Sequence, residues 1–296
     1  MPSVALATCR AFPNLDDEDR LAIPTLAALG ITGVPAVWDD PAVDWSSFDA
    51  VVLRETWDYV EVRDAFLAWL EHVDSVSRML NPPAVVRWNT DKRYLRVLAD
   101  AGVPIVPTAF IEPGDGVDGW APPAGSRDFV VKPAVSAGSR DTVRYATEGD
   151  LGAAREHVRR LVADGRTVMV QPYLDAVDSE GETALLFLGG EFSHAIRKGP
   201  LLERDVEGEK VGGLFVQEQI DPREATSAQL AVATTALAAV PGGPAALLYA
   251  RVDLIPDATG APMLLELELA EPSLFLSHAP GSADRLARAV AARLGA

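Results

Sequence analysis

The 296-residue sequence has one cysteine, four histidines and no long apolar run without breaks. Cys9 has no second cysteine to pair with, and a lone thiol is typical of a reducing compartment, so we expect a cytoplasmic protein. The sequence contains none of the HxH, HExxH or Cys/His spacings of zinc sites, and no GxSxG motif of a serine hydrolase. Disulfide scaffolds, zinc enzymes and acyl-enzyme chemistry are therefore not expected.

Positive charge is also scarce. The chain carries 26 Lys and Arg against 43 Asp and Glu, a formal net charge of −17, which excludes a surface built to coat nucleic acid. The apolar stretch at 230–250 is interrupted by threonines and by the sequence PGGP, so it cannot cross a membrane as a helix. We expect no nucleic-acid or membrane partner, although a few lysines and arginines can still hold a small anion.

The first third of the chain alternates strand and helix patterns. Strand patterns and helical spacing follow one another over residues 4–9, 16–30, 32–38, 49–56 and 62–73. This alternation predicts a parallel sheet with ligand-facing loops at the carboxyl ends of its strands. Beyond about residue 89, strands in hairpins dominate, with helices near 149–164 and 224–240. The fold class that we expect is therefore an α/β domain followed by an α+β body.

Two lysines stand where they could hold phosphate groups. Lys132 ends a strand and precedes the small residues 136–139, whose backbone N–H groups can approach phosphate oxygens. Lys92 falls in the first turn of an expected helix, where a cation opposes the helix dipole unless an anion lies nearby. An ordinary hairpin and a chance surface lysine are the alternative explanations.

The stretch QPYLDAVDSEGET, residues 171–183, leaves a strand and turns acidic. Backbone groups at a strand edge can hydrogen-bond to adenine, and Asp178, Glu180 or Glu182 could accept from ribose hydroxyls. A solvated acidic turn is the alternative.

Near the end of the chain, Glu266 and Glu268 lie on one face of the strand pattern LLELELAEPS, opposite a leucine face. They are only about 7 Å apart along a strand, where like charges repel. Asp253 follows apolar residues in another strand, where an unpaired carboxylate is costly. Three such carboxylates indicate a Mg²⁺ site, or a structural cluster neutralised by Arg251 and Arg197.

Taken in order, NTDK, VVKPAVSAGS, VMVQPYL, RVDL and LELELAEPS resemble the ATP-grasp superfamily, on its glutathione-synthetase and D-alanine–D-alanine-ligase side. The resemblance implies a Rossmann-like (pre-ATP-grasp) domain over 1–88, a central lobe with a glycine-loop lid over 89–172 and a C-terminal lobe with the metal site over 173–296. The two α+β lobes would clasp ATP.

The resemblance also implies roles for individual residues. ATP would be bound by Lys92, Lys132, Ser136, Ala137, Gly138, Ser139, Gln171, Tyr173, Leu174 and Asp178, the last of these on the ribose. Arg197, together with Lys132, would act on the transferred phosphoryl group. Asp253, Glu266 and Glu268 would hold two Mg²⁺ ions, with Mn²⁺ as a substitute. The last ligand is often Asn in this family, so Glu268 adds a negative charge.

Within the superfamily, RETWDY and VSAGSRDT look most like the cyclo-ligases of D-cycloserine biosynthesis. That resemblance implies phosphorylation of the carboxylate of O-ureido-D-serine, followed by ring closure through an internal nitrogen. The expected partner is a small amino-acid-like substrate, and relatives suggest a homodimer. The expected substrate wall comprises Arg10, Arg54, Thr56, Trp57, Asp58, Tyr59, Pro272 and Ser273. An intermolecular carboxylate–amine ligase and a non-catalytic ATP-binding scaffold are the alternatives.

Overall fold

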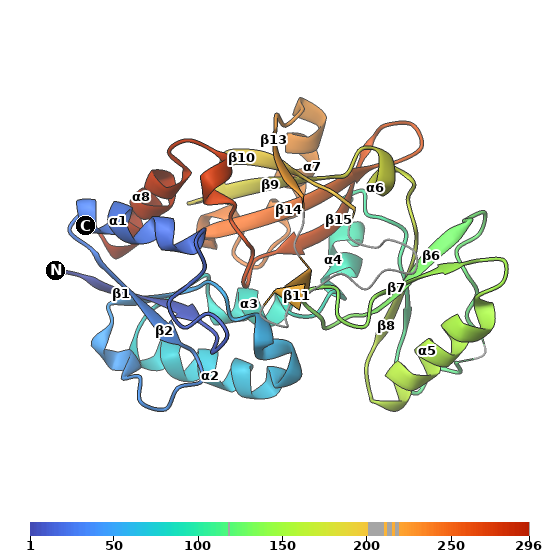
Figure 1. Ribbon diagram of the computed structural model, residues 1–296, viewed down its shortest axis with the longest axis horizontal. Helices are drawn as coiled ribbons and strands as arrows, with labels where there is room; N and C mark the ends of the chain where they lie inside the picture. Colours follow the sequence, from blue (N-terminus) through green and yellow to red (C-terminus); the bar gives the residue numbers. More distant parts are fainter. Residues whose placement is uncertain (118, 201–209, 212–214, 217–218, 296) are drawn as a thin grey trace.

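The N-terminal residues form the parallel sheet that the alternating pattern predicts (Figure 1). In a computed structural model, which describes residues 1–117, 119–200, 210–211, 215–216 and 219–295, four strands lie in the order β2-β1-β3-β4 and all neighbours are parallel. They are β1 (Ser3–Thr8), β2 (Thr32–Val37), β3 (Ala50–Leu53) and β4 (Met79–Leu80). β1 and β3 are almost wholly buried, as is typical of parallel strands covered on both faces.

Helices cover both faces of this sheet. α2 (Arg63–Val76) packs on one face, while α1 (Ala22–Ala28) and the C-terminal helix α8 (Ser282–Leu294) lie side by side on the other (Figure 1). α1 is shorter than the helix expected over 16–30, because Asp19–Leu21 form a separate 3-10 turn whose Asp19 is held by a buried arginine. α8 was not among the expected helices, and it joins the end of the chain to the first sheet.

A second sheet is antiparallel throughout. Its order is β5-β8-β6-β7, and α5 (Leu151–Ala163) covers one face. The strands are β5 (Ala109–Ile111), β6 (Asp128–Pro133), β7 (Val143–Ala146) and β8 (Val168–Pro172). β6 ends at the loop of small residues, and β8 leads into the short helix α6 (Ala176–Ser179).

The third sheet is also antiparallel and has the order β13-β10-β9-β14-β15. Its strands are β9 (Glu182–Leu188), β10 (Glu191–Lys198), β13 (Ile220–Arg223), β14 (Tyr249–Pro256) and β15 (Pro262–Glu268). α7 (Ser227–Ala238) packs on one face of this sheet, and α8 packs against part of the other face. β11 (Lys210–Val211) and β12 (Phe215–Val216) form a separate antiparallel pair.

The segment of α3 (Pro83–Asn89) and α4 (Tyr94–Asp100) covers the outer edge of β15. The Asn89 amide donates to the Leu267 carbonyl and accepts from the Leu269 N–H, both at 2.7 Å, and the Tyr94 hydroxyl contacts both backbone groups of Leu267 at 2.9 Å. An edge strand would otherwise leave these groups unpaired. Lys92 lies in the turn between the two helices, not in the first turn of a helix as expected, so one segment both fixes the carboxylate strand and carries this lysine.

The three larger sheets of the described chain lie within the residue ranges expected for the three domains. α8 nevertheless packs on α1, and the α3–α4 segment packs on β15. The boundaries at 88 and 172 therefore stay predictions.

Candidate active site

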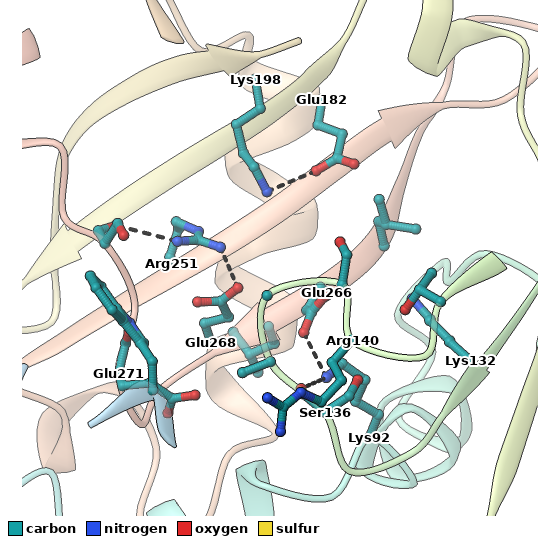
Figure 2. Close-up of a pocket in the computed structure, with 18 of the residues that line it drawn as sticks. Lys92, Lys132, Ser136, Arg140, Glu182, Lys198, Arg251, Glu266, Glu268 and Glu271 are labelled. Carbon is teal, nitrogen blue, oxygen red and sulfur yellow. Dashed lines mark hydrogen bonds and ion pairs between the residues drawn. The ribbon is translucent and has the colours of Figure 1, made fainter. Parts of the chain in front are cut away.

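A cavity of about 1340 Å³ is lined by residues of all three larger sheets or of the loops that follow them (Figure 2). Fourteen of the predicted site residues line it: Trp57, Tyr59, Lys92, Lys132, Ser136, Ala137, Gly138, Ser139, Gln171, Tyr173, Leu174, Glu266, Glu268 and Ser273. The predicted site residues that do not line it are Arg10, Arg54, Thr56, Asp58, Asp178, Arg197, Asp253 and Pro272. Segments far apart in the sequence thus supply one cavity.

The two predicted phosphate lysines both face this cavity. The Lys92 amino group donates to the Ser136 carbonyl at 2.6 Å and pairs with Glu266 at 3.1 Å, so it ties the start of the loop 136–139 to the carboxylate strand. The Lys132 amino group makes no ion pair or hydrogen bond with any residue that the structure describes. Burial lowers the pKa of Lys132, with the Glu266 carboxylate opposing this and the Lys92 ammonium adding to it.

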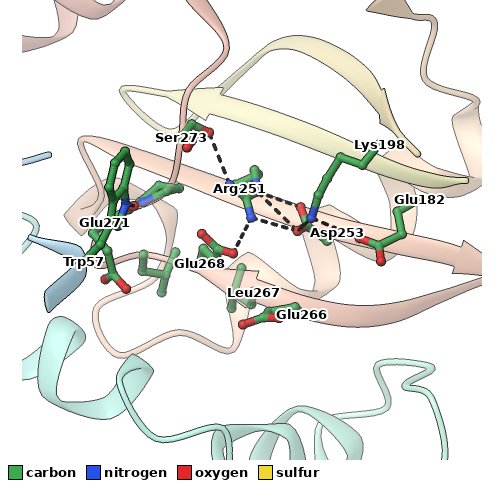
Figure 3. A network of polar contacts seen from close by, with 12 residues as sticks. Trp57, Glu182, Lys198, Arg251, Asp253, Glu266, Leu267, Glu268, Glu271 and Ser273 are labelled. Atoms are coloured by element: carbon green, nitrogen blue, oxygen red, sulfur yellow. Dashed lines mark hydrogen bonds and ion pairs between the residues drawn. The ribbon is translucent and has the colours of Figure 1, made fainter. Parts of the chain in front are cut away.

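Arg197 is not brought to the cavity. Its guanidinium donates to the Glu180 carbonyl at 2.7 Å and lies 3.6 Å from Asp221. Lys198, the next residue of β10, lines the cavity instead and contacts both Glu182 and Asp253 at 3.1 Å (Figure 3). Successive side chains of a strand point to opposite faces, so Lys198 rather than Arg197 faces the cavity.

The three predicted metal ligands meet on β14 and β15, where Asp253 lies opposite Glu266 and Arg251 lies opposite Glu268 (Figure 3). Each carboxylate faces a cation. Arg251 donates to Asp253 at 2.9 Å and to Glu268 at a shorter distance. The neutralising role expected of Arg251 is therefore present, whereas Arg197 has no part in it.

These contacts set the protonation of the carboxylates. Burial would raise the pKa of Asp253, but Arg251 and Lys198 outweigh it and hold that pKa below its ordinary value. Burial likewise opposes Lys92 and Lys132 at Glu266, whose pKa is also lowered. Burial raises the pKa of Glu268 to about 7, because Arg251 offsets the effect only in part and the neighbouring carboxylates add to it.

The chemistry of the donor set fits Mg²⁺, and two of its three carboxylates are accessible from the cavity although each is paired with a cation. The side chains of Glu266 and Glu268 are 27% and 28% exposed and present hard oxygen atoms to the cavity. Asp253, only 1% exposed, is saturated by Arg251 and Lys198. Among the described residues, the carboxylates whose oxygens all lie within 4.8 Å of one another are Asp16, Asp19 and Glu55 instead. Asp19 in that set is neutralised by a buried arginine.

The residues predicted to contact adenine lie at the end of β8 and directly after it. The Gln171 side chain donates to Thr108 at 2.8 Å, and Tyr173 and Leu174 follow it along the wall. Asp178 lies outside the cavity lining, where it accepts from Arg144 and from the Tyr173 hydroxyl. Glu182, another of the three acidic candidates, does line the cavity.

Most residues of the expected substrate wall bind other parts of the protein instead of facing the cavity. Arg54 is 2% exposed, pairs with Asp19 at 2.8 Å and donates to the Pro272 carbonyl, while Arg10 turns outwards to Asp39. Thr56 is buried, and Asp58 accepts from Trp38. Only three of the expected residues face the cavity: Trp57, Tyr59 and Ser273.

Several charged residues of the cavity lining were not among the predicted site residues, and three of them carry the argument below: Lys198, Arg251 and Glu271. Each is adjacent to a predicted position in sequence or belongs to a quoted motif. Lys198 follows Arg197, while Arg251 and Glu271 belong to the motifs RVDL and LELELAEPS. Strand alternation was the signal that could have identified the first two.

Comparison with known proteins agrees with this geometry. Residues 4–81 match the family model described as the N-terminal domain of the D-cycloserine synthetase DcsG. The cycloserine biosynthesis protein DcsG of Streptomyces lavendulae is 41% identical over 305 residues, covering 99% of each chain. The chain belongs to the DcsG family of ATP-grasp ligases.

Solved structures of ATP-grasp ligases share the fold. The crystal structure of D-cycloserine synthetase DcsG matches with a TM-score of 0.88 at 39% identity, covering 99% of both chains. The ATP-grasp ligase PsnB, solved with its minimal precursor, Mg and ADP, matches with a TM-score of 0.63 at 18% identity, covering 99% of this chain and 97% of PsnB. The predicted ATP-grasp architecture and the resemblance to the D-cycloserine cyclo-ligases are thus confirmed.

Membership of the DcsG family makes the protein an enzyme that forms C–N bonds, so the alternative of a non-catalytic scaffold is disfavoured. The ATP-grasp fold supports the expected use of ATP and Mg²⁺, which stays a prediction for this chain together with the number of ions and the homodimer. In the part of the chain that the structure describes, no helix is both long and apolar enough for a membrane span.

Proposed function

We propose that this ligase converts O-ureido-D-serine to D-cycloserine through an acyl-phosphate. ATP gives its γ-phosphoryl group to the substrate carboxylate, which releases ADP. The nitrogen bonded to the side-chain oxygen then attacks the acyl carbon, closes the five-membered ring and expels phosphate. The carbamoyl group on that nitrogen is transferred to water and leaves as carbamic acid. The relative of this chain named for cycloserine biosynthesis supports the choice of substrate.

The observation that carries the proposal is one cavity in which cations and carboxylates of the second and third sheets, of the loops that follow them and of the turn between α3 and α4 face each other (Figure 2). Its volume of about 1340 Å³ exceeds the roughly 300–1,000 Å³ of most small-molecule pockets, which leaves room for a nucleotide and a small second substrate. The chain's lysines supply positive charge for the phosphates, and the reaction needs no protein nucleophile.

Lys132 is the first residue that we assign to phosphate binding, because its ammonium has no carboxylate partner among the described residues. Lys92 and Lys198 join it when phosphate oxygens replace Glu266, Glu182 and Asp253 as their partners. Arg251 faces the same cavity beside Glu268 and is positioned to hold the carboxylate or the transferred phosphoryl group. Mg²⁺ held by Glu266 and Glu268, with Asp253, would offset the charge on the phosphate oxygens.

The loop 136–139 is placed to exclude water from the reaction. Gly138 and Ser139 have φ values of 59° and 57°, so the loop makes a tight left-handed bend beside the cavity. Lys92 anchors its start, and Arg140, directly after it, pairs with Glu61 of the first domain. A closed loop would protect the acyl-phosphate from hydrolysis.

The test is ADP release with O-ureido-D-serine as the sole amino acid, followed by identification of the product by mass spectrometry. We expect ADP and D-cycloserine to form together without an added amine. ADP release only when a second amine is supplied would instead indicate the intermolecular ligase.

A further inference from the structure

Glu271 differs from the other carboxylates near the end of the chain. Asp253, Glu266 and Glu268 each pair with a lysine or arginine at the cavity. Glu271 lies three residues beyond Glu268 and lines the same cavity, yet it forms no ion pair with any Lys or Arg of the described residues (Figure 2). A carboxylate in such a position calls for a cation that the ligand brings.

Two aromatic residues hold Glu271: Trp57 by its backbone and Tyr59 by its carboxylate, and Figure 3 shows the first of these contacts. The Trp57 indole N–H donates to the Glu271 carbonyl at 3.0 Å, and the Tyr59 hydroxyl donates to its carboxylate. Tyr59 stacks on Phe66 at 4.7 Å between ring centroids, and Phe12 lies edge-on to Trp57 at 5.4 Å. A carboxylate held beside aromatic rings is a well-matched binding site for an ammonium group.

The raised pKa of Glu271 is consistent with a carboxylate that has no cation of the protein beside it. Burial raises the pKa of Glu271 to about 8, and Glu268 adds to this, while Lys92 and Tyr59 oppose it. An ammonium group beside the carboxylate would stabilise the ionised form.

We propose that Glu271, framed by Trp57 and Tyr59, binds the α-ammonium group of the substrate and makes the enzyme specific for α-amino acids with a free amino group. This inference rests on the proposed function, because it assumes that a carboxylate on the same substrate carbon is activated. Arg251 and Lys132 would then face the carboxylate end, and Glu271 the ammonium end.

The test is Glu271→Gln, assayed with O-ureido-D-serine and with its desamino analogue, in which hydrogen replaces the α-amino group. Loss of one charged hydrogen bond predicts a rise in KM for O-ureido-D-serine of about 10- to 100-fold. The KM for ATP and the Mg²⁺ requirement should change less than about threefold, because Glu271 is not assigned to either. Wild type should discriminate strongly against the desamino analogue, and Glu271→Gln should lose most of that discrimination.

Glu18→Gln is the matched control. Glu18 also lines the cavity, but its carboxylate already accepts from the Ser277 N–H and hydroxyl. We expect this variant to keep both the KM for O-ureido-D-serine and the discrimination. A larger effect at Glu18 than at Glu271 would overturn the inference.

Other outcomes separate the inference from the proposed function. If Glu271→Gln raises mainly the Mg²⁺ requirement, Glu271 serves the metal and the ammonium site is wrong. If the wild type turns over O-ureido-D-serine and Glu271→Gln does so equally well, only the ammonium site is wrong. If the wild type releases no ADP with this substrate, the proposed function fails and the inference fails with it.

Discussion

The two halves of the cavity treat charge in different ways. In the half of the cavity proposed to bind the nucleotide, Lys92, Lys198 and Arg251 are paired with carboxylates of the same protein, and Lys132 is not paired with any carboxylate that the structure describes. In the substrate half, formed by Trp57, Tyr59 and Glu271, the carboxylate is beside aromatic rings and has no cation among the described residues. On the proposed function, the cations of the nucleotide half exchange partners when ATP and Mg²⁺ bind, whereas Glu271 in the substrate half receives its cation from the ligand.

The largest expected effect is loss of ADP release on replacing Glu266 or Asp253, and the melting temperature should distinguish the two variants. Glu266→Gln should reduce ADP release by more than about 100-fold and keep the melting temperature, because this side chain is partly exposed. Asp253→Asn should also lose activity, but it leaves Arg251 and Lys198 with a buried neutral partner. Breaking such a buried pair costs about 3–5 kcal/mol, so the melting temperature should fall clearly. Equal melting temperatures for the two variants would contradict this difference.

Neighbouring residues of β10 give the next comparison. Lys198→Ala should raise the KM for ATP by about 10-fold or more, since it removes a charge that faces the phosphates. Arg197→Ala should change the same constant less than about threefold, because its side chain is outside the cavity lining. The reverse ranking in a steady-state assay would restore Arg197 as the phosphate-binding residue.

Asn89 holds the edge of β15, the strand that carries Glu266 and Glu268. Asn89→Ala leaves the Leu269 N–H without its partner at a buried edge and removes one of two hydrogen bonds to the Leu267 carbonyl, which should lower the free energy of unfolding by about 1–3 kcal/mol. Because Leu267 lies between Glu266 and Glu268, the Mg²⁺ requirement should rise more than the KM for the amino acid. A loss of stability with an unchanged Mg²⁺ requirement would limit Asn89 to a structural role.

The smallest expected effect concerns a buried carboxyl behind the substrate half. Burial raises the pKa of Glu55 to about 8, and Asp19 adds to it. A carboxyl whose pKa is higher in the folded state stabilises the fold below its unfolded pKa and loses this contribution as the pH rises through about 8. The melting temperature of the wild type should therefore fall between about pH 5 and pH 9. Glu55→Gln should flatten this decline, and Glu191→Gln, at an exposed site, should not.

The alternation of apolar and polar residues predicted which side chains face the cavity in the nucleotide half better than in the substrate half. The Leu–Glu alternation of LELEL identified both the strand and its polar face, because one side of β15 must pack in the core. The choice between Arg197 and Lys198 depended on which face of β10 meets the cavity. A register shift between Phe192 and His194 lies earlier in that strand, and local sequence does not reveal it.

The loops after β1 and β3 have no period from which to predict the direction of a side chain. Arg10 and Arg54 look alike in sequence, yet one faces solvent and the other is buried against Asp19. Glu271 lies past the end of its strand, so alternation no longer applies to it. α8, in contrast, had a helical pattern between Gly281 and Gly295 that could have been recognised.

The most direct test of the account follows the oxygen atoms of the substrate. O-ureido-D-serine labelled with ¹⁸O in its carboxylate should transfer one labelled oxygen to inorganic phosphate for each D-cycloserine formed, because the acyl-phosphate bridge contains a carboxylate oxygen. Phosphate that carries no label while D-cycloserine forms would contradict carboxylate activation in this cavity.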